Sequence, residues 1–165
     1  MNVKDLVEKL IKNNKTISSM ESCTGGGVAN AITNIEGASE VLKFSAVTYS
    51  NEFKIKMGVS KEVIDKYSVY SNETACEMSK NISMFTNSDY GIGITGKLNR
   101  VDINNPYGDD NDVFVSIYDR ENNKFYNDKV EATLPSRKEN KKLVIEKVIN
   151  MLLNIIWNEE GDFCA

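Results

Sequence analysis

One turn near the start of the chain gathers several side chains that can do chemistry. Residues 19–27 read Ser-Met-Glu-Ser-Cys-Thr-Gly-Gly-Gly, which places a carboxylate, hydroxyls and a thiol beside three glycines. The turn lies between a strand-like run, residues 16–20, and a helix-like run that begins near Val28. A strand-to-helix turn presents backbone N–H groups and the positive end of the helix dipole, which favour an anion or a developing oxyanion. The turn therefore predicts phosphate binding or acyl chemistry.

The composition restricts what can activate a nucleophile in that turn. The chain contains no histidine, which excludes Ser-His-Asp and Cys-His systems and histidine-based metal sites. Cys23, Cys76 and Cys164 form no CxxC pair and are odd in number, so we expect neither a disulfide framework nor a bound metal. A base that acts near neutral pH must then be a desolvated lysine or a carboxylate.

The bulk properties are those of a globular protein with one domain. At 165 residues the chain is long enough to bury a core without covalent staples. We expect this domain to span residues 1–165, with its core in residues 3–157 and a frayed tail at residues 158–165.

Charge and hydropathy narrow the range of partners. The net charge is −4 and no sustained basic stripe is present, which argues against direct contact with nucleic acid. No apolar run reaches the roughly 18 residues of a membrane span. The first segment carries Lys4, Asp5, Glu8 and Lys9, unlike a signal peptide. We therefore expect a cytoplasmic protein with no membrane contact.

Hydrophobic spacing and capping residues predict the elements. The apolar residues at 3, 6, 7, 10 and 11 recur at helical spacing and predict a first helix. Runs rich in β-branched and aromatic residues predict strands at residues 16–20, 41–49, 90–95, 113–118 and 124–130. Further helices are predicted at residues 28–34 and after the N-cap candidates Ser60, Ser71 and Ser136.

Helices and strands alternate early in the chain, and a hairpin comes late. This order predicts an α/β fold, a three-layer α/β/α architecture with a mixed sheet. The helix after Ser71 places Ala75, Met78, Ile82 and Phe85 on one face. Ser136 and Glu139 have the spacing of a capping box at the start of the last helix. Between the strand at 90–95 and the hairpin, residues 96–112 are polar and predict a loop.

The chemistry-bearing motifs resemble those of the CinA C-terminal domain family, the nicotinamide-nucleotide amidases. The resemblance covers about residues 3–156, essentially the whole chain, and rests on motifs in matching order and spacing. These motifs are Glu21-Ser22-Cys23-Thr24-Gly25-Gly26, Val47-Thr48-Tyr49-Ser50-Asn51-Glu52 with Lys54, Thr95-Gly96, Gly58-Val59, Tyr70-Ser71-Asn72-Glu73 and Ser136-Arg137. Because two-domain members carry an additional N-terminal domain with no counterpart here, we expect a stand-alone version.

The resemblance implies an activity and a site. Family members hydrolyse the carboxamide of nicotinamide mononucleotide to nicotinic acid mononucleotide and ammonia, in pyridine-nucleotide recycling, and no cofactor is implied. Carried over to this chain, Ser22 is the nucleophile, Lys54 is its base, and Tyr49 relays a proton or orients Lys54. The backbone N–H groups of Cys23, Thr24 and Gly25 hold the oxyanion. The other substrate-binding residues are Glu21, Gly26, Asn51, Thr95, Gly96 and Arg137, the last as a phosphate clamp.

One loop departs from the family pattern. Family members usually continue Gly-Ile-Ala-Gly-Pro-Asp-Gly-Gly after the strand and later Pro-Val-Gly-Thr-Val. This chain has Gly96-Lys97-Leu98-Asn99-Arg100 and later Asn111-Asp112-Val113. The glycine-proline loop that would shape one pocket wall is therefore replaced, and Lys97 and Arg100 predict anion binding with altered selectivity.

Several residues have a structural interpretation beside the functional one. Glu21 is equally an acceptor for backbone N–H groups, Cys23 a small buried side chain, and Thr95 a strand cap. Lys56 is a candidate for the neighbouring cation that lowers the pKa of Lys54. The basic residues at 138, 141 and 142 are by default a solvated helix face.

Three functional hypotheses follow. The first is an amidohydrolase acting on a pyridine nucleotide through Ser22 and Lys54. The second is a diverged nucleotide-binding or regulatory module that has lost turnover through its altered loop. The third, suggested only by the family's name, is an oligomer-forming partner in competence or DNA-damage responses. In each case we expect a homo-oligomer, in the first instance a dimer, with Trp157 as a packing or oligomer contact.

Overall fold

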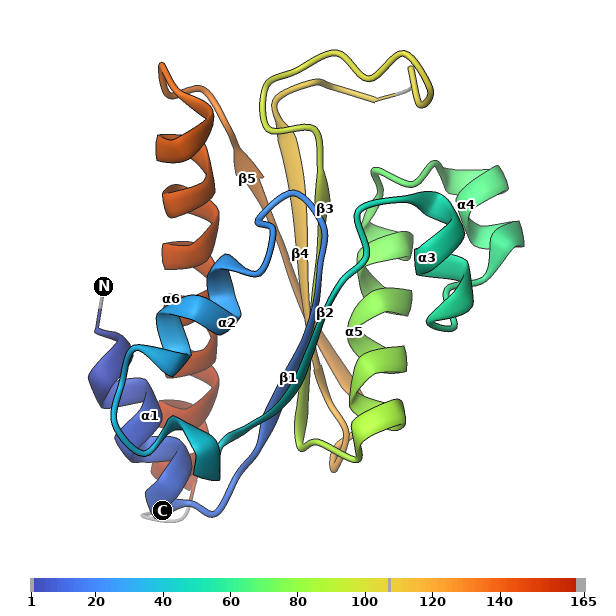
Figure 1. The fold of residues 1–165 in the computed structure, drawn as a ribbon. Helices are drawn as coiled ribbons and strands as arrows, with labels where there is room; N and C mark the ends of the chain where they lie inside the picture. Colours follow the sequence, from blue (N-terminus) through green and yellow to red (C-terminus); the bar gives the residue numbers. More distant parts are fainter. Residues whose placement is uncertain (1, 107, 163–165) are drawn as a thin grey trace.

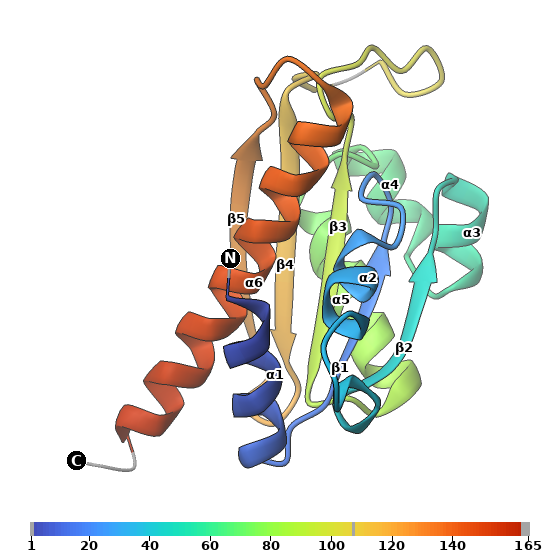
Figure 2. The same ribbon diagram turned by 60° about the vertical axis from the view of Figure 1, so that its left-hand side comes forward.

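The computed structural model describes residues 2–106 and 108–162 (Figures 1 and 2). Within these residues one five-stranded mixed sheet has the strand order β2-β1-β3-β4-β5. β1 is parallel to β2 and β3, whereas the β3-β4 and β4-β5 pairs are antiparallel. The strands are β1 (Ile17–Glu21), β2 (Leu42–Val47), β3 (Tyr90–Gly96), β4 (Asp112–Asp119) and β5 (Lys124–Glu131).

Helices cover both faces of this sheet, as Figure 1 shows, which confirms the predicted three-layer α/β/α architecture. On one face lie α1 (Val3–Lys12), α2 (Gly27–Thr33) and α6 (Arg137–Asp162). On the other lie α3 (Asn51–Lys56), α4 (Lys61–Tyr67) and α5 (Asn72–Thr86). A 3₁₀ turn, η1 (Ala38–Glu40), leads into β2.

Capping residues mark the starts of several helices. Ser136 and Glu139 form the expected capping box, since the N–H of each donates to the side chain of the other at 3.1 and 3.0 Å. Ser71 Oγ accepts from the N–H of Thr74 at 3.1 Å. Ser60 occupies the N-cap of α4, but its hydroxyl donates to Glu62 at 2.9 Å and does not bond a helix N–H.

Two glycines bring α5 against the centre of the sheet. A Cβ placed on Gly91 would lie 1.9 Å from the carbonyl oxygen of Ser79, and one on Gly93 would lie 2.3 Å from that of Ala75. No side chain fits between the helix and β3 at these positions. The glycines of this strand therefore allow close packing of two backbones.

Expected bounds differ from the structure at one strand and at the last helix. The strand expected at 41–49 ends at Val47, because the following residues turn into α3. Phe85, which was predicted to share a helix face with Ala75, Met78 and Ile82, is 68% exposed, whereas those three residues are buried. It lies near the end of α5 beside Phe44 of β2, with ring centroids 5.8 Å apart, and β2 is an edge strand with no neighbouring strand beyond it to extend the core.

The last helix also runs further than expected. Fraying was expected from residue 158, but α6 continues to Asp162, and residues 163–165 lie outside the described part of the chain. Glu159 accepts from the hydroxyl of Tyr90 at 2.7 Å, and Glu160 pairs with Lys9 at 3.0 Å. These contacts hold the last turns of α6 against α1 and the start of β3. Across the described residues, no helix combines the length and apolar character needed to cross a bilayer.

Candidate active site

The glycine-rich turn follows β1 and begins with a buried carboxylate. Glu21 Oε1 accepts from the Thr24 hydroxyl at 2.7 Å and from the N–H of Val28 at 2.9 Å. Its Oε2 accepts from the Ser19 hydroxyl at 3.0 Å and from the N–H of Ala29 at 3.1 Å. The carboxylate thus satisfies the first N–H groups of α2, as an N-cap does from a neighbouring strand. Of the two interpretations of Glu21, the structure supports a structural acceptor for backbone N–H groups.

The backbone of the turn leaves two N–H groups for a ligand. The N–H of Gly25 donates to the carbonyl of Ser22 at 2.9 Å, so it is not available as the third oxyanion donor expected from the sequence. The N–H groups of Cys23 and Thr24 make no hydrogen bond to another residue in the described part of the chain. Gly26, with φ +89°, is the N-cap of α2 and requires a residue that tolerates the left-handed region.

Ser22 and Lys54 lie within hydrogen-bond distance. Lys54 Nζ is 3.0 Å from Ser22 Oγ and 2.6 Å from the carbonyl oxygen of Thr48. Lys54 is 2% exposed although it comes from a short helix with neighbours on the surface. α3 is positioned by Ser50, whose hydroxyl accepts from the N–H of Phe53 at 3.2 Å. Because α3 starts at this cap just after β2, the side chain of Lys54 points toward Ser22 at the end of β1.

Burial lowers the pKa of Lys54 from 10.5 to about 8, while the charges of Cys23 and Asp102 act weakly in the opposite direction. The neighbouring cation expected at Lys56 plays no part in this shift. Lys56 lies on the outer side of α3, paired with Glu52 at 2.8 Å. Near pH 8 a substantial fraction of Lys54 is therefore the neutral amine, which can accept a proton from Ser22.

Cys23 is the small buried side chain that one interpretation expected. Burial raises the pKa of its thiol to about 12, so the reactive thiolate is scarce at neutral pH. The hydroxyl of Ser22, not this thiol, is within reach of Lys54.

Tyr49 and Arg137 form a pair at the entrance of the site. Arg137 Nη2 donates to the Tyr49 hydroxyl at 3.0 Å, and its Nη1 donates to the carbonyl of Lys97 at 3.2 Å. Tyr49 is largely exposed and has no hydrogen bond to Lys54 in the described structure. The contact that the structure shows for Tyr49 is therefore with Arg137, and its expected role toward Lys54 stays a prediction.

The ends of β3 and α3 supply further residues. Thr95 is fully buried, and its hydroxyl donates to the carbonyl of Val69 at 2.9 Å, which is the strand-end structural role. Asn51 Nδ2 donates to Asn105 Oδ1 at 3.1 Å and so joins α3 to the loop after β3.

A cavity of about 580 Å³ opens beside Ser22 and Lys54. Of the site residues expected from the sequence, seven line it: Ser22, Cys23, Tyr49, Asn51, Lys54, Gly96 and Arg137. The others are not among the described residues of its lining: Glu21, Thr24, Gly25, Gly26 and Thr95. The cavity is thus formed where β1, α3, the loop after β3 and the start of α6 meet.

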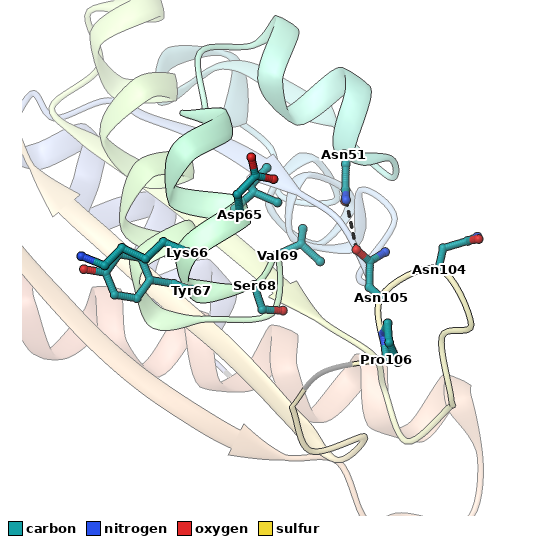
Figure 3. A pocket seen from close by; sticks show the side chains of 10 residues that line it. Asn51, Asp65, Lys66, Tyr67, Ser68, Val69, Asn104, Asn105 and Pro106 are labelled. Carbon is teal, nitrogen blue, oxygen red and sulfur yellow. Dashed lines mark hydrogen bonds between the residues drawn. The ribbon is translucent and has the colours of Figure 1, made fainter.

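A second cavity of about 490 Å³ adjoins the first (Figure 3). It lies between the end of α4 and the loop after β3, and its lining shares Asn51, Val69, Asn104 and Asn105 with the first cavity. Figure 3 shows the Asn51–Asn105 hydrogen bond at this boundary. Within residues 2–106 and 108–162, no cluster of three or more cysteine or acidic side chains is placed to hold a metal ion.

The family model of the CinA C-terminal domain matches residues 2–156. The chain belongs to the CinA C-terminal domain family. Two CinA-like proteins are similar to parts of it. The protein of Endomicrobium trichonymphae is 47% identical over 88 residues, which are 53% of this chain and 21% of that protein. The protein of Fervidobacterium nodosum is 44% identical over 90 residues, which are 54% of this chain and 22% of that protein. The matched part thus spans about a fifth of the length of these relatives.

Solved structures of CinA-related proteins share the fold. The competence/damage inducible protein CihA from Agrobacterium tumefaciens superposes with a TM-score of 0.81 at 24% identity, over 93% of this chain and 95% of that one. A CinA superfamily protein from Klebsiella pneumoniae superposes with a TM-score of 0.82 at 20% identity, over 96% and 99% of the two chains. At these identities the likeness establishes the fold.

In this CinA domain the structure adds pocket residues that sequence reasoning did not select. Asp102 and Tyr70 both line the main cavity, and the Tyr70 hydroxyl donates to Asp102 Oδ2. Lys97, expected as an anion ligand, is buried and pairs with Asp110 at 3.1 Å, so it braces the loop. Arg100 lines the cavity with its side chain exposed. The only sequence signal for Asp102 was the presence of a carboxylate in the loop that departs from the family pattern.

Proposed function

We propose that this CinA domain hydrolyses the carboxamide of a pyridine nucleotide, in the first instance nicotinamide mononucleotide, to the acid and ammonia. The observation that carries the proposal is the 3.0 Å approach of Lys54 Nζ to Ser22 Oγ, with the lysine buried and its pKa lowered to about 8. A buried amine beside a hydroxyl is a nucleophile and base pair that needs no histidine.

The proposed reaction has two halves. Neutral Lys54 takes the proton of Ser22 as Oγ attacks the amide carbon, and the Cys23 and Thr24 N–H groups hold the oxyanion. One such donor typically contributes about 2.7 to 4 kcal/mol. Lys54 then gives the proton to the amide nitrogen, and the C–N bond breaks. Ammonia is released, and the acyl group remains on Ser22 as an ester. Water then attacks this ester with Lys54 as base. Lys54 transfers the proton to Ser22 Oγ as the C–O bond breaks, and the acid is released.

The cations at the cavity support a phosphorylated substrate. Arg137 is held by Tyr49 and the Lys97 carbonyl, which leaves other guanidinium N–H groups for a ligand. A guanidinium fixed in this way suits the bidentate recognition of phosphate. A cavity of about 580 Å³ has room for a mononucleotide.

The test is ammonia release from nicotinamide mononucleotide by the purified protein. Ser22→Ala should abolish release while leaving the circular dichroism spectrum unchanged. Ser60→Ala is the matched control, because Ser60 bonds Glu62 away from the cavity, and it should retain full activity. Release that persists in Ser22→Ala would falsify the role assigned to Ser22.

A binding or regulatory module is the second candidate function. The loop that forms one cavity wall favours it, because this loop departs from the family pattern. Its Lys97 is paired with Asp110. Calorimetry that shows binding of nicotinamide mononucleotide by a chain that releases no ammonia would support this alternative. The cytoplasmic location, the homodimer and a link to competence or DNA damage stay predictions from the sequence, and light scattering of the purified protein tests the dimer.

A further inference from the structure

A single carboxylate faces the main cavity. Among the described residues that line it, four are cationic and Asp102 alone is acidic. A negative charge opposes the binding of a phosphorylated substrate, so its presence beside the nucleophile needs a chemical reason. The loop that carries Asp102 forms the wall of the cavity that Ser22 and Lys54 also line.

Asp102 is held in place and remains ionised. Its Oδ2 accepts from the Tyr70 hydroxyl and from Asn105 Nδ2 at 3.0 Å, and its Oδ1 accepts from the N–H of Asn104 at 3.0 Å. The hydrogen bond from Tyr70, followed by that from Asn105, lowers the pKa of the carboxyl. A carboxylate has about four acceptor positions. These hydrogen bonds occupy three of them, and the backbone N–H of Asn105 also contributes to the lowered pKa, so a further donor to Oδ1 would share that oxygen with backbone N–H groups.

The carboxylate lines the same cavity as Ser22 and Lys54. Its charge raises the pKa of Lys54, against the larger lowering by burial. The other groups with charges or protons at this cavity are Cys23, Tyr49, Tyr70, Lys97, Arg100 and Arg137. The cations among these cannot accept a hydrogen bond from an amide. The Tyr49 hydroxyl already accepts from Arg137, and the Tyr70 hydroxyl is engaged with Asp102.

The substrate and product of the proposed reaction differ in the group that would lie against the Asp102 carboxylate. The carboxamide presents an NH₂ group with two donors and no charge, whereas the product carboxylate presents only acceptors and a negative charge. We propose that Asp102 Oδ1 accepts an N–H of the substrate carboxamide and repels the product carboxylate. Asp102 is then the residue that selects amide over acid and promotes product release. This inference rests on the proposed function.

The experiment compares the binding of the two mononucleotides by calorimetry in the Ser22→Ala background, where no turnover occurs. The ligands are nicotinamide mononucleotide and nicotinic acid mononucleotide. Because both carry the same ribose phosphate, contributions from Arg100 and Arg137 cancel in the ratio of their dissociation constants. Adding Asp102→Asn should shift this ratio toward the acid by about tenfold, since neighbouring like charges commonly cost more than the 1.4 kcal/mol to which tenfold corresponds.

Two further variants separate charge from loop anchoring. Tyr70→Phe removes the hydrogen bond that ties Asp102 to the body of the domain and keeps the carboxylate, so the ratio should stay within about twofold of the parent. Asp109→Asn changes an exposed carboxylate of the same loop that does not line the cavity among the described residues, and it should leave the ratio unchanged. A loosened loop would weaken both ligands alike.

The outcomes distinguish this inference from the function on which it rests. If both ligands bind the parent and Asp102→Asn leaves their ratio unchanged, Asp102 does not select the amide, and the amidase proposal stands. If neither ligand binds the parent, the amidase proposal and the role of Asp102 are both overturned.

Discussion

The side-chain nitrogen of Lys54 lies 2.6 Å from the backbone carbonyl oxygen of Thr48. Thr48 is itself fixed to the end of β1, because its N–H donates to the carbonyl of Glu21 at 2.8 Å. The carbonyl therefore holds the amine beside Ser22, the next residue after β1. A lysine without this acceptor would gain by extending to solvent. The contact explains how a six-residue helix keeps a catalytic candidate buried.

Replacing Lys54 with methionine should remove activity and keep the fold. Loss of a positioned base typically slows a reaction by about 10²- to 10⁴-fold. An apolar side chain of similar length occupies the same buried position without a desolvated charge, so the free energy of unfolding should stay equal or rise. Ammonia release and urea unfolding measure the two effects. Lys56→Met, which breaks only an exposed pair with Glu52, should leave both unchanged.

Activity should rise as the pH rises through about 8. The base form of Lys54 is the neutral amine, and its pKa in the folded protein is about 8. The profile of kcat/KM reports this ionisation in the free protein. A profile already flat between pH 6 and 8 would assign the base to another group.

The same pKa predicts how stability depends on pH. Lysine in the unfolded chain titrates near 10.4, above its value of about 8 in the fold. Between these values the unfolded state holds a proton that the folded state has lost, so stability increases with pH across the window. Below pH 8 the burial penalty is present in full. Urea unfolding of the wild type and of Lys54→Met should therefore differ most near pH 7 and converge toward pH 10.

Replacing Glu21 with alanine should destabilise the domain. The change leaves four donors without their acceptor, three of them buried and two of them N–H groups of α2. A buried donor left unsatisfied costs about 1 to 3 kcal/mol, so we expect a loss of about 3 kcal/mol or more. Glu8→Ala, which breaks an exposed pair with Lys4, should change stability by less than about 0.5 kcal/mol. Equal effects of the two substitutions in urea unfolding would contradict the anchoring role of Glu21.

Gly91 and Gly161 should respond oppositely to alanine. A Cβ on Gly91 meets the Ser79 carbonyl oxygen at 1.9 Å, whereas a Cβ on Gly161 has no atom of the described residues within 4 Å. Gly91→Ala should cost about 3 kcal/mol or more, because α5 must move away from β3. Gly161→Ala lies in α6 and should be neutral or stabilising by up to about 1 kcal/mol. Thermal unfolding of both variants checks this contrast.

Tyr49→Phe distinguishes the holding of Arg137 from a proton relay. Without the hydroxyl, Arg137 loses one of its two fixed contacts, so KM for a phosphorylated substrate should rise a few-fold while kcat and its pH profile stay unchanged. A large fall in kcat with an altered profile would instead support the relay expected from the sequence. Steady-state kinetics across pH gives both quantities.

The sequence by itself determined most of the elements and their order, although no bounds were predicted for α3 or for the turn η1. Periodicity, capping residues and strand propensity act over a few neighbouring residues, which is why the capping box at Ser136 and the late hairpin were predicted with nearly correct bounds. It also supplied Ser22 and Lys54 as a candidate pair, through the missing histidines and the spacing of the family motifs.

Only the tertiary structure decided what these residues do. Burial lowers the pKa of Lys54, and the cavity that this lysine lines is formed by the turn after β1, the segment after β2 and the loop after β3, which are far apart in the chain. In the same packing, Glu21 accepts from the N–H groups at the start of α2, and Tyr49 accepts from Arg137. This packing also places Asp102 at the cavity beside Tyr70. Desolvation and hydrogen bonding depend on which atoms surround a group, and a linear pattern specifies those atoms only after the chain has folded.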